Sequence, residues 1–271
     1  FGARRIPRAG RAGRADSVAM TDLSRYDDWL AWLSATAEAD PDVLCVWVGG
    51  SAATGGYDEW SDLDVVALCT PGTAFEAYAR WLASARAAFD IRDVWEPPAS
   101  TWPDGRQCFL NLQDRPGLLL EPTRLVDLVV LDLADQHSHV DVRRHGDLVV
   151  LYDPGSRIVL EPEDVSTAME QAVDQVRQRR VTGEWLVNRA IARGHVAEAV
   201  DLYLRFPLAG VVRLERVRHC PWRHDYGLRY LREDLPAEVA DRIEELVPGV
   251  SSASLERSEE HTSELQSRQY L

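Results

Sequence analysis

Apolar runs separated by turn-forming residues dominate the chain between residues 43 and 69. Val43–Val48 is an unbroken apolar run of the length expected for a buried strand, and two glycines end it. Residues 63–69 have the same apolar character after their first two positions. Together, these segments predict two strands, with a short helix of small residues beginning at Ser51 between them.

The pattern on either side of these strands predicts helices and further strands. Residues 22–39 carry apolar side chains at helical spacing, and Pro41 ends that pattern. A second helix is expected at residues 74–89. Further strands are expected at residues 91–95, 108–112, 118–120, 125–133 and 148–152. This order of elements predicts a mixed sheet flanked by helices.

From about Val165 onward the apolar spacing becomes helical. Met169, Val173 and Val176 form one stripe, and further amphipathic segments follow at residues 185–192, 197–206 and 209–218. We therefore predict the α+β class, with a mixed-sheet domain at residues 20–155 and a helical-bundle domain at residues 156–250. Asp153-Pro154-Gly155 supplies the turn expected between them.

Both ends of the chain differ in character from these two domains. The sequence begins with Phe1, and Met20 is a sensible start for the first domain, so residues 1–19 are expected to be a non-native leader. Residues 257–267 resemble the translation of a sequencing-library adaptor. We expect the native sequence to end or diverge near residue 256, and residues 251–271 to be a disordered or artefactual tail.

The charge of the chain argues against some classes of binding partner. The chain has 271 residues and a formal net charge of −14, and all 30 basic residues are Arg. Broad binding to nucleic acid needs clustered positive charge, so the composition argues against it. A triphosphate ligand would have to be met by arginine, metal and backbone amides, since the chain offers no lysine.

Cysteine usage and hydropathy bear on location. The four cysteines show no CxxC spacing, which predicts buried free thiols in a reducing compartment, and we expect a cytoplasmic protein. No apolar stretch reaches the length of a membrane span. The oligomeric state is left open.

Candidate chemistry lies at the start of the second predicted strand. Asp62 and Asp64 project to the same side of an extended segment, where like charges favour a bound cation, and their hard oxygens suit Mg²⁺. Gly49 and Gly50 allow a ligand to approach the backbone closely, and the amides and hydroxyl near Ser51 can donate to phosphate oxygens. The pattern predicts a metal-dependent phosphate site.

These residues resemble the signature of the nucleotidyltransferase superfamily related to DNA polymerase beta, in which a Gly-Gly or Gly-Ser turn precedes an Asp-x-Asp strand by about ten residues. Gly50, Ser51, Asp62 and Asp64 fill those positions. Residues 192–199 bear a softer likeness to the carboxy-terminal domain of aminoglycoside-type nucleotidyltransferases. The resemblance implies a third carboxylate from a neighbouring strand.

The run of residues 124–133 offers two candidates for that third carboxylate. Asp127 and Asp132 are five positions apart, so on a regular strand they face opposite sides. We choose Asp127, which lies near the beginning of its strand as Asp62 and Asp64 do. Asp132 is expected to be a capping residue at the strand end.

The resemblance implies transfer of a nucleoside monophosphate, AMP from ATP as the first choice, to a hydroxyl of a small molecule, with aminoglycoside-like antibiotics among the candidate acceptors. It implies two Mg²⁺ ions held by Asp62, Asp64 and Asp127. A separate general base is left open between Glu184 and Asp225. The alternatives are a toxin–antitoxin nucleotidyltransferase that modifies protein or tRNA, and a catalytically silent nucleotide-binding module.

Overall fold

The computed structural model describes residues 4–5, 22–112 and 124–249. The chain divides into two compact units, Phe1–Glu163 (unit 1) and Asp164–Leu271 (unit 2). The division falls eight residues after the boundary at residue 155 that the sequence predicts. Residues 156–163 stay with unit 1 because β9 (Val159–Leu160) pairs with β7 (His139–Val140) and the Glu163 amide donates to Asp141 at 2.9 Å.

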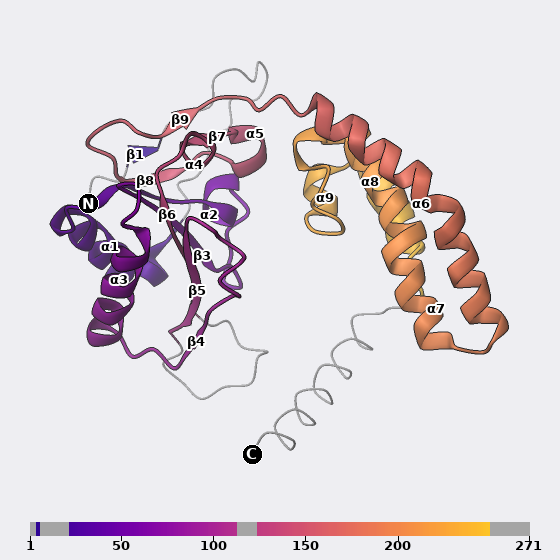
Figure 1. Cartoon of the computed structure of the whole chain (residues 1–271), viewed down its shortest axis with the longest axis horizontal. Coiled ribbons are helices and arrows are strands. Elements are labelled where there is room, and N and C mark those ends of the chain that lie inside the picture. The colour runs from indigo at the N-terminus through magenta and orange to yellow at the C-terminus, as the bar shows by residue number, and fades with distance from the viewer. Residues whose placement is uncertain (1–3, 6–21, 113–123, 250–271) are drawn as a thin grey trace. The chain divides into compact units, whose positions relative to one another are not determined.

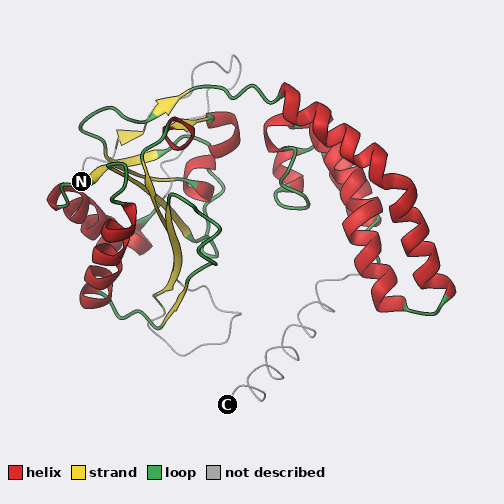
Figure 2. Cartoon of the chain, in the orientation of Figure 1, coloured by secondary structure: helices red, strands yellow, loops and turns green. Residues whose placement is uncertain are grey.

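Unit 1 is built on a seven-stranded mixed sheet in the order β1-β8-β2-β3-β6-β5-β4 (Figures 1 and 2). Only the β3–β6 pair is parallel within this sheet, among the described strands. The α+β class with a mixed sheet is therefore confirmed. The strands are β1 (Arg4–Arg5), β2 (Val43–Val48), β3 (Leu63–Cys69), β4 (Asp93–Trp95), β5 (Gly105–Asn111), β6 (Leu125–Asp132) and β8 (Val149–Tyr152).

Two helices, α1 (Asp27–Ala39) and α3 (Ala74–Ala88), cover one face of the sheet (Figure 1). Trp29 of α1 and Trp81 of α3 are almost fully buried in the core that they share with Leu63 and Val65 of β3. Alternation along β3 therefore sends its odd-numbered residues into this core and Asp64 to the other face.

The opposite face carries a smaller apolar cluster at one end and polar side chains at the other. Leu68, Val129 and Leu131 pack there with Ala53 of α2 (Gly50–Thr54) and with Leu148. Two short helices, α4 (Asp135–Ser138) and α5 (Val142–His145), follow β6 in the chain, and α5 contacts α2. Asp64 and Asp127 lie on this face, at the beginning of their strands.

The ranges of β2, β3 and β6 agree closely with the sequence pattern, whereas β5 begins three residues before the strand predicted at residues 108–112. β2 and β3 begin and end at the predicted residues, and β6 ends one residue early. Helix α1 begins later than predicted, because residues 24–26 form a short 3₁₀ turn, η1 (Ser24–Tyr26). The strand predicted at residues 118–120 lies outside the described residues.

A two-residue strand near the start of the chain lies at the edge of the sheet. Arg4 and Arg5 pair antiparallel with Val150 and Val149 of β8. The expected leader at residues 1–19 thus includes a two-residue edge strand. Its remaining residues, and the expected tail at residues 251–271, lie outside the described residues.

The described residues of unit 2 form helices and turns only. Helix α6 (Ser166–Ala192) is one element of 27 residues that joins two segments predicted separately. Helices α7 (Val196–Tyr203) and α8 (Ala209–His219) are linked by a π-helical turn, η2 (Leu204–Leu208), which contains Pro207. The remaining elements are η3 (Pro221–Arg223), α9 (Leu231–Asp234) and α10 (Ala237–Glu245).

A buried arginine organises the loop that follows α8. The Arg216 side chain has no exposed surface and donates to the Gly227 carbonyl at 2.7 Å and to the Asp234 carboxylate at 2.7 Å. Arg223 donates to the other oxygen of Asp234 at 2.7 Å. The buried carboxylate is therefore met by two cations, the arrangement in which burying charge is tolerated.

None of the helices in the described ranges combines the length and apolar character that crossing a bilayer requires.

Candidate functional site

Strand pairing places Asp64 beside Asp127. The two residues are direct partners in the parallel β3–β6 register, between the pairs Leu63–Val126 and Val65–Leu128. Those flanking residues are buried in the core under α1 and α3, so both aspartates project from the opposite face. The predicted convergence of two carboxylates from neighbouring strands is present in the backbone.

The glycine turn after β2 lies directly against Asp64. The Gly49 amide donates to the Asp64 carbonyl at 2.9 Å. A Cβ atom added to Gly50 would lie 1.7 Å from Asp64 Oδ2, and Gly50 has a φ of +55°. Glycine is therefore required here for two reasons: a left-handed backbone and the space occupied by the carboxylate.

Ser51 and Asp62 complete the set expected from the sequence. The Ser51 Oγ atom is buried and has no hydrogen-bond partner among the described residues, so its hydrogen-bonding capacity is unused. Asp62 lies one residue before β3 and is partly buried. The negative charge of Asp62 contributes to the raised pKa of Asp127, so the two carboxylates interact electrostatically.

The surroundings of Asp127 perturb its titration. Burial, and to a smaller extent the charge of Asp62, raise its pKa from 3.8 to about 6, and the hydrogen bond from Gln107 opposes them. Among the described residues, the groups that shift this pKa include no cation. A carboxylate in this setting is stabilised by a positive ligand.

A chain of hydrogen bonds that the sequence pattern did not reveal holds Asp127. The Gln107 side-chain amide donates to Asp127 Oδ1 at 2.7 Å, and the Trp102 indole donates to Gln107 Oε1 at 2.8 Å. The indole contact fixes which end of the amide faces Asp127. Gln107 lies on β5, and its proximity depends on the β5–β6 register, which no local pattern encodes.

Asp132 has a structural role at the other end of β6. Its Oδ1 accepts hydrogen bonds from the amides of Thr73 at 3.1 Å and Ala74 at 3.0 Å, at the start of α3. Asp132 is therefore a capping residue, as the sequence suggested, but it caps a helix that precedes it in the chain. Its carboxylate points to the α3 side, away from Asp64 and Asp127.

The acidic residues suit a magnesium site by the chemistry of their oxygen atoms. Asp62, Asp64 and Asp127 offer hard oxygen ligands and share one region of the sheet face. Among the described residues, no three His, Cys, Asp or Glu side chains already form a metal-binding group. Rotation of these carboxylates would be needed to bring their oxygens onto one ion.

The two candidates for a separate general base both belong to unit 2. Glu184 Oε1 lies 3.4 Å from Arg180 Nε, one helical turn away, and Asp225 lies in the exposed part of the loop organised by Arg216. Neither has a feature that marks it as a base.

Comparison with known proteins adds no family assignment. No protein-family model matches the chain, and no curated protein has a significantly similar sequence.

Proposed function

We propose that unit 1 is a Mg²⁺-dependent nucleotidyltransferase domain that transfers a nucleoside monophosphate, AMP from ATP as the first choice, to a hydroxyl of a small molecule. The observation that carries the proposal is the contact between the Gly50 turn and Asp64, together with the pairing of Asp64 with Asp127. A phosphate-binding turn and a pair of carboxylates are the parts that such chemistry needs side by side.

The glycine turn is the proposed phosphate site. Glycine at position 50 keeps the backbone free of a side chain next to Asp64, so a phosphate can approach both the turn and the carboxylate. The partnerless hydroxyl of Ser51 supplies one donor for a phosphate oxygen. Loss of that donor should weaken binding of the nucleotide, while loss of Asp64 should prevent turnover.

Asp127 is the proposed acceptor of the proton. In the transfer, the acceptor oxygen forms a bond to the α-phosphorus, the bond from that phosphorus to pyrophosphate breaks, and the hydroxyl proton passes to Asp127. Gln107 occupies Oδ1, so Oδ2 is the atom that would receive the proton. Without a metal, burial raises the pKa of Asp127 to about 6, so at neutral pH the group is mostly ionised and can accept a proton.

Asp62 and Asp64 would hold Mg²⁺, with Asp127 as a further ligand. When bound, Mg²⁺ would neutralise the phosphate charge and lower the pKa of the acceptor hydroxyl. An acceptor of the aminoglycoside kind is polycationic, and the chain's net charge of −14 favours the approach of such a molecule.

The test is incubation of the full chain with ATP, Mg²⁺ and a panel of hydroxyl acceptors that includes aminoglycosides. Mass spectrometry should detect one acceptor gaining the mass of a nucleotidyl group, which is a nucleoside monophosphate less one water, with release of pyrophosphate. Replacing ATP by the other nucleoside triphosphates identifies the preferred base, and EDTA should stop the reaction.

Two results would count against the proposal. A folded sample that gives neither product nor pyrophosphate with any nucleotide contradicts catalysis, and binding of ATP without turnover would indicate a silent nucleotide-binding module. If a protein or an RNA becomes labelled in place of a small molecule, the transfer chemistry still holds, but the acceptor is a macromolecule.

A further inference from the structure

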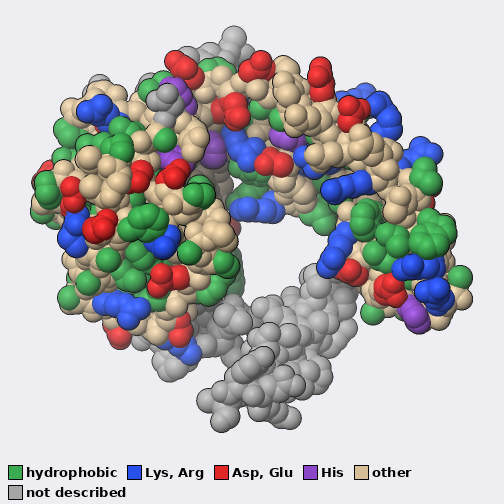
Figure 3. Space-filling model, in the orientation of Figure 1, with side chains coloured by type: hydrophobic (Ala, Val, Ile, Leu, Met, Phe, Trp, Pro, Cys, Tyr) green, Lys and Arg blue, Asp and Glu red, His purple; other side chains and the backbone are tan. Residues whose placement is uncertain are grey.

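Unit 2 contains a pocket of about 260 Å³ between α6, η2 and α8. Arginine side chains are frequent on the visible face of this unit (Figure 3). Four arginines line the pocket, in a chain whose formal net charge is −14. These four residues are Arg179, Arg180, Arg205 and Arg213. The local excess of positive charge is therefore opposite in sign to that of the chain as a whole.

Small residues bring the helices close together and leave a shaped apolar floor. A Cβ atom on Gly183 of α6 would lie 2.6 Å from the Phe206 side chain, and one on Gly210 of α8 would lie 3.3 Å from Val176. The π-helical turn presents Phe206 and Pro207 at this contact. Local π-helical geometry is frequent at functional sites.

The four arginines differ in whether an acidic side chain forms an ion pair with them. Arg180 lies 3.4 Å from Glu184, and Arg205 lies 2.9 Å from Asp201. Among the described residues, neither Arg179 nor Arg213 has an acidic partner. The Arg213 Nε atom is buried without a hydrogen-bond partner in this part of the chain, and its Nη1 has only the neutral Gln175 oxygen at 3.4 Å.

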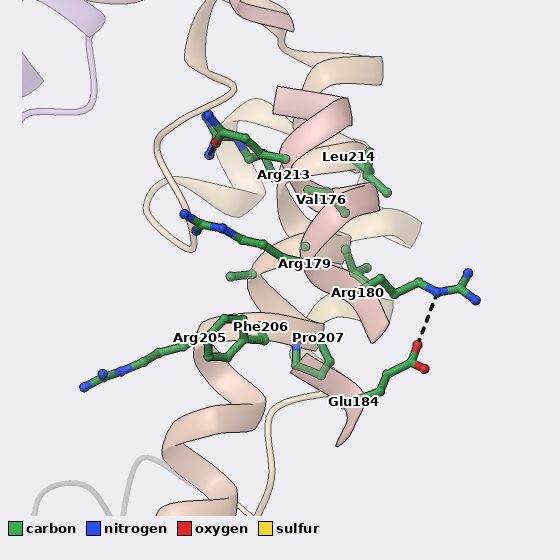
Figure 4. Close-up of a pocket in the computed structure, with 13 residues that line it drawn as sticks. Val176, Arg179, Arg180, Glu184, Arg205, Phe206, Pro207, Arg213 and Leu214 are labelled. Atoms are coloured by element: carbon green, nitrogen blue, oxygen red, sulfur yellow. Dashed lines mark hydrogen bonds and ion pairs between the residues drawn. The ribbon is translucent and has the colours of Figure 1, made fainter. Parts of the chain in front are cut away.

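The side chains also divide by direction. Figure 4 shows Arg179, Arg205 and Arg213 extending to one side of the pocket, while Arg180 and Glu184 meet on the other. The two arginines that lack acidic partners thus point to the same side of the pocket. A guanidinium is suited to carboxylate and phosphate because its donors lie in one plane and can form two parallel hydrogen bonds.

We propose that this pocket binds a small organic anion in which a phosphate or a carboxylate is joined to an apolar group. Arg179 and Arg213 would hold the anionic group, and Phe206, Pro207 and Leu214 would contact the apolar part. The pocket volume suits a single ring or a short aliphatic group. The site lies wholly within unit 2 and is independent of the chemistry proposed for unit 1.

Fluorine NMR titration of the full chain tests the site. The probes are 4-fluorophenyl phosphate and 4-fluorophenylacetate, with neutral 4-fluorobenzyl alcohol for comparison and inorganic phosphate as a competitor. We expect saturable binding of at least one anionic probe, with at least about tenfold weaker affinity in R179Q and in R213Q, because each removes a charge-assisted hydrogen bond.

Two controls separate this site from others. Arg218 is exposed on α8 and does not line the pocket, so R218Q should bind the probe as the original chain does. Asp64→Asn should also leave binding unchanged, which distinguishes this pocket from the phosphate site of unit 1. Circular dichroism verifies that each variant is folded, and R179Q alters only an exposed side chain.

Equal affinities in R179Q, R213Q and R218Q would overturn the proposal. So would binding of neither anionic probe, or binding of the neutral alcohol as tight as that of the anions. If inorganic phosphate binds as tightly as the anionic aromatic probes, the apolar floor contributes nothing to affinity. That result would contradict the site as proposed.

Discussion

The two ends of the β3–β6 strand pair use aspartate in opposite ways. At the beginning, Asp64 and Asp127 lie side by side, and burial and the charge of Asp62 raise the pKa of Asp127 to about 6. At the end, Asp132 accepts two backbone hydrogen bonds at the start of α3. One strand therefore carries a carboxylate that its surroundings make costly to ionise and another that helix amides stabilise.

The role of an aspartate on a strand is therefore set by the face that it occupies and by the groups that lie against that face. Five residues separate Asp127 from Asp132, so the alternation of the strand sends them to opposite sides. Backbone donors of α3 meet one of them. Asp127 lies on the face that also carries the glycine turn and the carboxylates of Asp62 and Asp64, which is the arrangement expected of a reactive site.

The largest expected effect follows from Asp64→Asn. It keeps the side-chain shape and removes a charged metal ligand, so the rate of nucleotide transfer should fall by at least about a thousandfold, or about 4 kcal/mol in the activation barrier. Pyrophosphate release measures it. Asp132→Asn, the matched change at the other end of the strand pair, should retain the rate per folded molecule; equal losses in both variants would contradict the contrast.

Gly50→Ala should cost both stability and activity. Its Cβ would collide with Asp64 Oδ2, and its φ of +55° is unfavourable for alanine, so we expect a loss of about 2 kcal/mol or more in the free energy of unfolding. Gly55 is the control, because it has a φ of +83° with nothing within 4 Å of an added Cβ. Gly55→Ala should lose about 1 kcal/mol and keep its activity, as measured by denaturant unfolding and transfer assays.

Asp132→Ala should destabilise the protein without altering the chemistry. Loss of the two hydrogen bonds at the start of α3 is expected to cost about 1 kcal/mol in the free energy of unfolding. Urea unfolding measures the effect. Asp132→Asn retains an acceptor oxygen and should lose less, and a rate per folded molecule that falls in either variant would assign this residue to the site after all.

The smallest effect is a gain in stability from Asp127→Asn. The folded-state pKa of about 6 lies above the ordinary value of 3.8, so ionised Asp127 opposes folding above pH 6, and this penalty disappears below about pH 4. Asparagine keeps an acceptor for Gln107. We expect a gain of about 1 kcal/mol at pH 8, reduced by solvent screening of the partly exposed group, and none at pH 3.5. Urea unfolding at both pH values checks it; a loss at pH 8 would contradict the electrostatic account.

The local pattern was sufficient to predict the strands that carry the site and the faces that their aspartates occupy. Val43–Val48 and the run beginning at Leu63 are apolar segments bounded by turn residues, and they form β2 and β3. Alternation alone places Asp127 and Asp132 on opposite faces of their strand. Asp64 and Asp127 could therefore be brought together from the sequence by parity and by the resemblance of the motif.

Contacts that depend on pairing between distant segments of the chain could not be predicted from the sequence. Gln107 reaches Asp127 only through the β5–β6 register, and Asp132 caps α3 across a gap of 58 residues or more in the chain. The full length of α6 also escaped prediction, because polar and charged residues separate its two apolar stripes. The pocket arginines Arg179 and Arg213 come from two helices, so their proximity has no local signal.

The most direct test of the proposed site is a crystal structure of the chain with Mg²⁺ and a nonhydrolysable ATP analogue. For the proposed site we expect metal density between Asp64 and Asp127, with Asp62 as a ligand and the phosphates against the backbone of Gly50 and Ser51. An analogue bound elsewhere at saturation, or Asp64 and Asp127 without a metal beside a bound triphosphate, would contradict it.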